Sequence, residues 1–219
     1  MYCLVPSVYE VLCGLILLLW NVLVIVVISR KVYEVFRRVD GHEAGIYVAR
    51  KLIHVLAGGV TVILLPVLFT SPIVPLICSL ILATIVYIPH RTGKLMYWFQ
   101  IPGRLSEVYF AIMWGVIVTS LWYVDVRLAV LPIFFMSCGD GITGIVRHLV
   151  NGRRTKSWIG NLAMALLCVP VGYLMYGVLG AASGLVASIV EHFDKIDDNI
   201  SIPLVSATVL VVPQIVTVL

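Results

Sequence analysis

The sequence predicts an all-α, polytopic integral membrane protein with about eight transmembrane helices. Of its 219 residues, 61% are hydrophobic and only 12% are charged, whereas soluble domains are roughly half apolar and about a quarter charged. Apolar runs recur along the whole chain, and Lys and Arg gather between them. Such a composition excludes a disordered chain, which needs low hydrophobicity. It also excludes a soluble enzyme, whose surface needs more charge.

Eight apolar runs approach the length that a membrane crossing requires. A helix needs about 20 residues to cross roughly 30 Å of hydrocarbon, and packed or bent helices can be shorter. The first run is expected to be a retained helix instead of a cleaved signal peptide, because no basic residue precedes it. The run that contains Asp140 and the short run rich in Gly and Ala are the unusual ones. The eight runs are 8–29, 52–70, 72–89, 107–124, 127–149, 159–179, 180–193 and 200–219.

The distribution of Lys and Arg predicts the orientation. Every basic residue except Arg127 lies in or next to a connection that follows an odd-numbered span. Because cytoplasmic loops carry the excess of Lys and Arg, both termini are expected outside. The chain is predicted to be a single membrane domain, 1–219. Its longest connection, 30–51, mixes apolar and basic residues in a pattern that fits a short amphipathic helix on the cytoplasmic leaflet.

Polar residues at membrane depth are the candidates for function. A charged side chain in the hydrocarbon costs about 2.5–3.5 kcal/mol on insertion scales, so it usually marks a site. The first group is Arg50, Lys51 and His54, which share a face at the start of the second span. Two cations and an imidazole near a helix N-terminus could hold phosphate oxygens. The alternative is that both cations only follow the positive-inside rule and that His54 is a packed residue.

The second group is Gly139-Asp140-Gly141, which follows a long apolar run. Glycines allow the backbone and the carboxylate to approach a phosphate or Mg²⁺ closely. We expect the helix to break here and to face a polar cavity that satisfies its backbone. The alternative is a helix end at the interface with a solvated Asp140.

Two further groups lie near the later spans. The run from Arg153 and Arg154 to Lys156, followed by Gly160, could hold a second phosphate, although such a run is also typical of a solvated loop. Glu191 and Asp198 carry carboxylates of the kind that Mg²⁺ prefers, with plain loop solvation as the alternative. Asp140, Glu191 and Asp198 are all predicted on the cytoplasmic side, so their carboxylates could converge between helices. The five cysteines form no CxxC pair and predict neither a zinc site nor a disulfide framework.

Four segments together resemble the polyprenol kinase family, which includes dolichol kinase, phytol kinase and CTP-dependent diacylglycerol kinase and is distantly related to phosphatidate cytidylyltransferases. The segments are RKLIHVLAG, GDGITGIV, KSWIGNLAM, and Glu191 followed by DNISIPL from Asp198. The resemblance covers about residues 48–210 and leaves the first helix unassigned. The chain departs from the family pattern at Asn161, where Ser or Thr is frequent, and in ISIPL where LTIPL is more usual.

The resemblance implies a membrane-bound kinase that uses CTP and Mg²⁺, or another divalent cation, to phosphorylate the hydroxyl of a long isoprenoid or other lipid alcohol. The reaction would occur on the cytoplasmic side of the cell membrane in a prokaryote or of the endoplasmic reticulum in a eukaryote. No nucleic-acid partner is expected, and the proton acceptor is either a carboxylate or His54. The implied site comprises catalytic Asp140, His54 and Asp198; nucleotide-binding or phosphate-binding Arg50, Lys51, Gly139, Gly141, Lys156, Gly160 and Asn199; and metal-binding Asp140, Glu191 and Asp198.

Other functions remain open from the sequence. A cytidylyltransferase that activates phosphatidate or archaeol phosphate with CTP would need a similar nucleotide site, but its long C-terminal Lys/Asp/His-Gly-Gly signature is missing. A small ion or solute transporter could use Asp140 and Glu191 as intramembrane ligands, but the polar residues gather on one side of the membrane instead of crossing it. No G-x-x-x-x-G-K-[ST] motif supports a Walker-type ATP site. The aspartates that follow Asp140-Gly141 in CDP-alcohol phosphotransferases are also absent.

Overall fold

The computed structural model describes residues 5–152, 155–193 and 195–218, and these residues form helices without a strand among them. A shorter apolar helix, Ser106–Trp122, accompanies five longer stretches. The all-helical class is therefore confirmed, and the long apolar helices are those of a membrane protein. The count of eight crossings and the sidedness of the termini stay predictions. The five stretches long and apolar enough to cross a membrane are Val8–Asp40, His42–Leu68, Ile73–Thr92, Val126–Asn151 and Trp158–Val190.

The first quarter of the chain is a long helical hairpin. The connection predicted as one short amphipathic helix is part of both arms, because Gly41 at φ 91° ends one arm and the next arm begins directly after it. Tyr33, only 1% exposed, packs against Gly45 across the hairpin. The first arm is α1 (Val8–Leu23), the π-helical η1 (Val24–Ile28) and α2 (Ser29–Asp40); the second is α3 (His42–Ile53), the π-helical η2 (His54–Gly59) and α4 (Val60–Leu68).

The remaining helices continue the antiparallel arrangement. They are α5 (Ile73–Thr92), α6 (Ser106–Trp122), α7 (Val126–Phe134), the π-helical η3 (Phe135–Gly139), α8 (Asp140–Asn151), α9 (Trp158–Val190) and α10 (Asp198–Val218). Helix α9 bends back on itself, because its backbone leaves the helical conformation at Tyr176 and Gly177. The backbones of the two arms meet where Gly172 faces Gly180, since glycines allow this close approach. The two arms correspond to the predicted spans 159–179 and 180–193.

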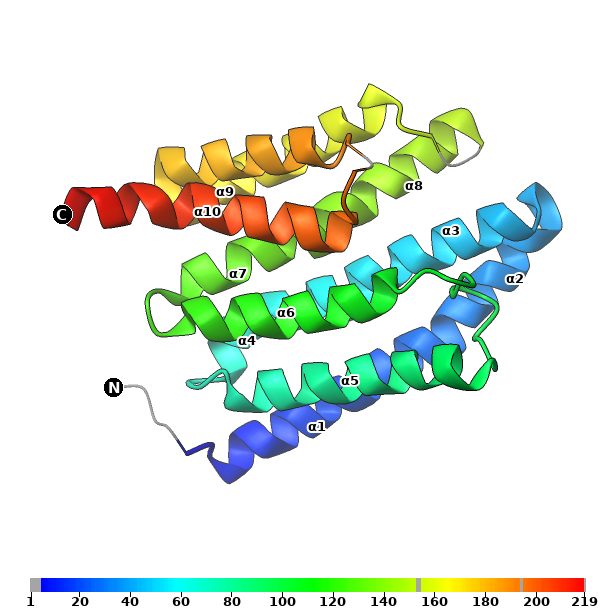
Figure 1. Ribbon diagram of the computed structural model, residues 1–219, viewed down its shortest axis with the longest axis horizontal. Coiled ribbons are helices and arrows are strands. Elements are labelled where there is room, and N and C mark those ends of the chain that lie inside the picture. The colour runs from blue at the N-terminus through cyan, green and yellow to red at the C-terminus, as the bar shows by residue number, and fades with distance from the viewer. Residues whose placement is uncertain (1–4, 153–154, 194, 219) are drawn as a thin grey trace.

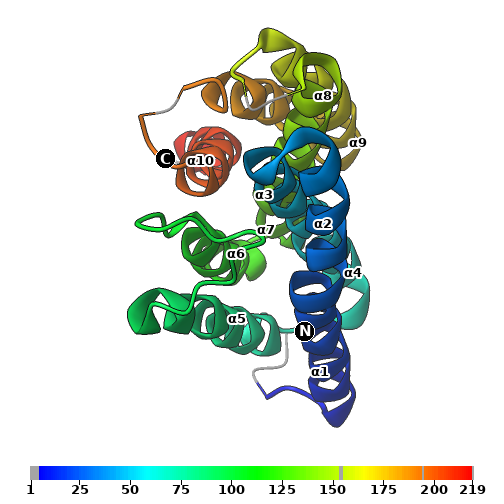
Figure 2. The ribbon, with the colours of Figure 1, turned by 90° about the vertical axis from the view of Figure 1, so that its right-hand side faces the viewer.

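The connections fall at two opposite ends of the molecule (Figure 1). The α2–α3, α5–α6, α8–α9 and α9–α10 connections lie at one end, which we call the basic end because it carries most of the Lys and Arg residues. The α4–α5 and α6–α7 connections and the bend in α9 lie at the opposite end. Figure 2, seen from the basic end, shows two layers, with α5, α6 and α10 in one and the other helices in the second. This grouping of the basic connections agrees with the alternation read from the sequence.

Candidate active site

Two π-helical segments meet at the centre of the site. In η2, Gly58 and Gly59 face Ser137 and Cys138 of η3 so closely that a Cβ atom on either glycine would collide with the opposing side chain. Small residues let helices in a membrane approach in this way, and π-helical turns often occur at functional sites. The contact places the start of η2, His54, beside the residue that follows η3, Asp140.

Asp140 is buried at 2% exposure and faces two basic side chains of the α3–η2 arm. Lys51 Nζ donates to Asp140 Oδ1 at 2.5 Å. His54 Nδ1 lies 3.1 Å from Asp140 Oδ2, within ion-pair distance but without the alignment of a hydrogen bond. The Lys51 stem passes directly over Gly144, where a Cβ atom would block it. A glycine one turn after Asp140 therefore opens the path by which the lysine reaches the carboxylate.

The expectation of a helix broken at Gly139-Asp140-Gly141 is wrong. The helix runs from Val126 to Asn151, and η3 absorbs the local irregularity within it. Gly139 packs against Met164 and Cys168, and Gly141 packs against Val55. Both glycines therefore serve close helix packing in this structure. The alternative of a solvated Asp140 at a helix end is wrong as well, because the residue is buried inside the helix.

A second buried ion pair lies two turns further along α8. Arg147 Nη1 and Nη2 donate to Glu191 Oε1 and Oε2 at 2.7 and 2.8 Å, and both side chains are 2% exposed. Asn161 Nδ2 donates to Glu191 Oε2 at 3.1 Å and its Oδ1 accepts from Arg147 Nη2 at 2.8 Å. Planar, two-pronged pairing of this kind fixes the position of both groups. Gly160 packs directly against Arg147, so its role here is to make room for the guanidinium.

Lys156 joins this pair to Asp198. Its Nζ donates to Glu191 Oε1 and to Asp198 Oδ2, each at 3.3 Å, and to the Glu191 carbonyl oxygen at 2.5 Å. Asp198 Oδ1 is buried without a hydrogen-bond partner in the described part of the chain. Carboxylate oxygens of Asp140, Glu191 and Asp198 lie within 4.8 Å of one another. The structure thus brings together the three carboxylates that the predicted topology places on one side, and we call them the carboxylate cluster.

The cluster has the donor chemistry of a hard divalent cation. Mg²⁺ takes oxygen ligands and is usually held by one or two protein carboxylates, with water and substrate phosphates completing its shell. Asp198 Oδ1 is an acceptor with no described donor, which a cation would satisfy. Both Glu191 oxygens, by contrast, already accept from Arg147. The residues present fit such an ion best at Asp198 and Asp140.

The other predicted site residues do not belong to the carboxylate cluster. Arg50 lines an apolar pocket beside the cluster. Asn199 Nδ2 donates to the Ser106 carbonyl oxygen at 2.9 Å, so it ties α10 to α6. Arg153 and Arg154 lie outside the described residues.

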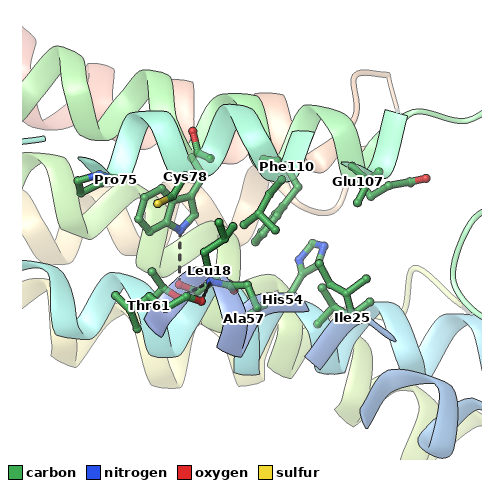
Figure 3. A pocket seen from close by; sticks show the side chains of 18 of the residues that line it. Leu18, Ile25, His54, Ala57, Thr61, Pro75, Cys78, Glu107 and Phe110 are labelled. Carbon is green, nitrogen blue, oxygen red and sulfur yellow. Dashed lines mark hydrogen bonds between the residues drawn. The ribbon is translucent and has the colours of Figure 1, made fainter. Parts of the chain in front are cut away.

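The apolar pocket is lined by α1, the α3–α4 arm, α5 and α6 and is partly open to the surroundings. Figure 3 shows it extending from Pro75 to Glu107, with His54 and Phe110 side by side between them. Their rings stack at a centroid distance of 4.3 Å. His54 therefore contacts the pocket with its ring and faces Asp140 with its Nδ1 atom. It is the link between the pocket and the carboxylate cluster.

Sequence reasoning missed the role of Arg147. In the sequence, the positive-inside rule alone accounts for this residue, so no pairing with Glu191 is predicted. A signal was present, because Arg147 lies seven residues after Asp140 and thus on the same face of a helix. The pairing with Glu191, 44 residues away, depends on the tertiary packing.

Comparison of the chain with family models, curated proteins and solved structures finds no match.

Proposed function

We propose that the protein is a membrane-bound, CTP-dependent kinase that transfers the γ-phosphate to the hydroxyl of a polyprenol or related lipid alcohol, as in the polyprenol kinase family. One observation carries the proposal: the carboxylate cluster, flanked by Lys51 and Lys156, adjoins an apolar pocket through His54. A site for phosphate and cation and a site for a lipid chain therefore share one wall.

Lys51 and Lys156 would bind the phosphates of the nucleotide. Phosphoryl transfer requires little covalent help from a protein and depends on positioned charges around the transferring group. The Lys51 and Lys156 side chains are 13% and 22% exposed, so both can be reached from outside the cluster. Each holds a carboxylate through a flexible stem, and a phosphate oxygen could replace that carboxylate as its partner.

Asp140 and Asp198 would hold a divalent cation. Such an ion neutralises charge on the phosphates and orients them. Glu191 would contribute mainly by position, because Arg147 and Asn161 fix its carboxylate and Lys156 joins it to Asp198. The pair of Arg147 and Glu191 would keep α8, α9 and the start of α10 in register around the cation.

The acceptor lipid would lie in the apolar pocket with its hydroxyl at the basic end. The walls of the pocket come from α1, the α3–α4 arm, α5 and α6 and are mainly aliphatic and aromatic, which suits an isoprenoid chain. His54 would contact the hydroxyl oxygen. Excluding water from this position would favour attack by the alcohol over hydrolysis of the nucleotide.

The test is a transfer assay on purified protein in detergent with Mg²⁺ and γ-labelled CTP or ATP. The acceptors are polyprenol, phytol, diacylglycerol and phosphatidate. The proposal predicts that label moves from CTP to one of the alcohols. Release of pyrophosphate from CTP only when phosphatidate is present would instead identify a cytidylyltransferase. If no acceptor reacts and an isotope-flux assay in liposomes shows transport, the kinase proposal is wrong.

A further inference from the structure

Glu107 of the pocket wall pairs with His90, and neither the resemblance nor the carboxylate cluster uses this pair. His90, near the end of α5, has its Nε2 atom within hydrogen-bond distance, 2.6 Å, of Glu107 Oε1. The two side chains are 8% and 11% exposed. When Glu107 is ionised its carboxylate can only accept, so His90 Nε2 is then the donor of this bond. The histidine therefore fixes the orientation of the Glu107 carboxylate.

Glu107 differs from Asn21 and Ser79, two other polar residues of the pocket wall. Asn21 Nδ2 donates to the Leu17 carbonyl oxygen and to Thr61 Oγ1, and Ser79 Oγ donates to the Leu76 carbonyl oxygen. Glu107 Oε2 is buried without a hydrogen-bond partner in the described part of the chain. A buried acceptor without a donor costs free energy, and a ligand that donates a hydrogen bond would remove this cost.

Glu107 is connected to the carboxylate cluster through Phe110 and His54. Glu107 and Phe110 are three residues apart on α6 and so share a face. Phe110 stacks on His54, which in turn lies against Asp140. Figure 3 shows Glu107 at the end of the pocket, beyond His54 and Phe110. A lipid whose chain fills the pocket could thus bring its headgroup to the Glu107 end.

We propose that Glu107, held by His90, binds the headgroup of the acceptor and selects a neutral hydroxyl over an ionised phosphate. The reason is chemical: Oε2 needs a donor, a hydroxyl has one, and an ionised phosphate has only acceptors. Arg50 also lines the pocket, and the relative binding of the two lipids shows which charge governs the headgroup. This inference rests on the proposed function only in identifying the pocket as the acceptor site.

The test uses two lipids that share one chain, geranylgeraniol and geranylgeranyl phosphate. Equilibrium binding of each labelled lipid to the detergent-purified protein is measured without nucleotide. We expect the wild type to bind the alcohol at least about tenfold more tightly than the phosphate. Glu107→Leu should weaken alcohol binding by about tenfold, the effect of losing a hydrogen bond to a charged group. Glu43→Leu, at an exposed carboxylate of the same end, should bind both lipids as the wild type does.

Two further variants separate headgroup binding from a structural role. Glu107→Gln keeps an acceptor oxygen but loses the charge, so alcohol binding should stay within about threefold while phosphate binding becomes tighter. His90→Leu should weaken alcohol binding, and His90→Gln, which retains an N–H donor, should restore part of it. Circular dichroism and gel filtration establish that each variant is folded, and Glu107→Gln serves as the test if Glu107→Leu does not fold.

Three results would overturn the inference: no binding of the alcohol to the wild type, equal affinity for the two lipids, or an unchanged preference in both Glu107 variants. The transfer assay on the same preparations tests the proposed function separately. Alcohol binding that depends on Glu107 without any phosphate transfer would reject the kinase proposal and leave this site in place. Phosphate transfer that is indifferent to Glu107 would reject this site and leave the kinase.

Discussion

Both ends of the molecule bury carboxylates, but the groups that satisfy them differ. At the opposite end, Glu10 is 3% exposed and accepts hydrogen bonds from Ser7, Thr70 and Ser71. These donors are backbone amides and hydroxyls, and they tie the start of α1 to the α4–α5 connection. At the basic end, the carboxylates of Asp140 and Asp198 are held by lysine side chains. One oxygen of Asp198 has no described donor at all.

This difference distinguishes a carboxylate that only holds helices together from one that can exchange its partner for a ligand. Backbone amides around Glu10 cannot leave without unfolding the helix start, so that carboxylate is fixed. Lysine stems are flexible, so Lys51 and Lys156 can exchange a carboxylate for a phosphate without any change in the backbone. We therefore propose that the basic end accepts both an anion and a cation, whereas Glu10 at the opposite end holds helices together.

The largest expected effect is on stability at the basic end. Arg147→Met leaves Glu191 buried without its two-pronged partner, and removing one member of a buried ion pair costs about 3–5 kcal/mol. Thermal or denaturant unfolding in detergent measures the loss. Arg127→Met, which breaks the exposed pair with Asp125, is the matched control and should change stability far less. Equal stability of the two variants would contradict a structural role for the buried pair.

Loss of activity should be largest for Asp140→Asn. The amide removes a ligand for the cation and the partner of Lys51, so phosphate transfer should fall at least about a hundredfold per folded protein. The rate with CTP and the best alcohol, normalised to the fraction that elutes as folded protein, measures the effect. Activity above a tenth of the wild-type value would remove Asp140 from the cation site.

Nucleotide binding should depend on Lys51. Lys51→Met removes a charge-assisted contact with phosphate and should weaken CTP binding by about 1.5–3 kcal/mol. Lys31→Met, at an exposed lysine of α2, should leave the affinity unchanged. If both variants bind CTP as the wild type does, Lys51 does not bind the nucleotide, and the positive-inside rule alone explains its position.

The smallest effect is expected at the opposite end. Glu10→Gln keeps the size of the side chain but weakens its hydrogen bonds to the α4–α5 connection, which should lower the free energy of unfolding by about 1–2 kcal/mol. Phosphate transfer at a temperature where the variant is folded should match that of the wild type. A loss of transfer comparable with that of Asp140→Asn would show that the two ends are not distinct in function.

Much of the helical arrangement could be predicted from the lengths of the apolar runs. The hairpin of α2 and α3 could not, because the amphipathic pattern of 30–51 fits a helix on the leaflet as well as two helices that bury Tyr33 between them. The bend in α9 falls at Tyr176 and Gly177, a few residues before the predicted boundary. No charged residue marks the turn in this Gly- and Ala-rich segment, which explains the shift.

The acidic residues of the candidate site could be predicted from the sequence. The residues that pair with them could not. Charge alternation alone places Asp140, Glu191 and Asp198 on one side, and the structure brings them together. The roles of Gly139 and Gly141 differ from the expectation, because glycines that suit close approach to a phosphate suit close helix packing equally well. The pairing of His90 with Glu107 joins the ends of two separate helices, and no periodicity within either helix indicates it.

The most direct test of the difference between the two ends is cation binding to the carboxylate cluster. Electron paramagnetic resonance of Mn²⁺ titrated into the purified protein, with and without CTP, measures it. We predict bound Mn²⁺ in the wild type and in Glu10→Gln, strengthened by CTP, and a clear loss of bound Mn²⁺ in Asp198→Asn. Absence of bound Mn²⁺ in the wild type, or equal binding in Asp198→Asn, would contradict the assignment of the basic end as the catalytic one.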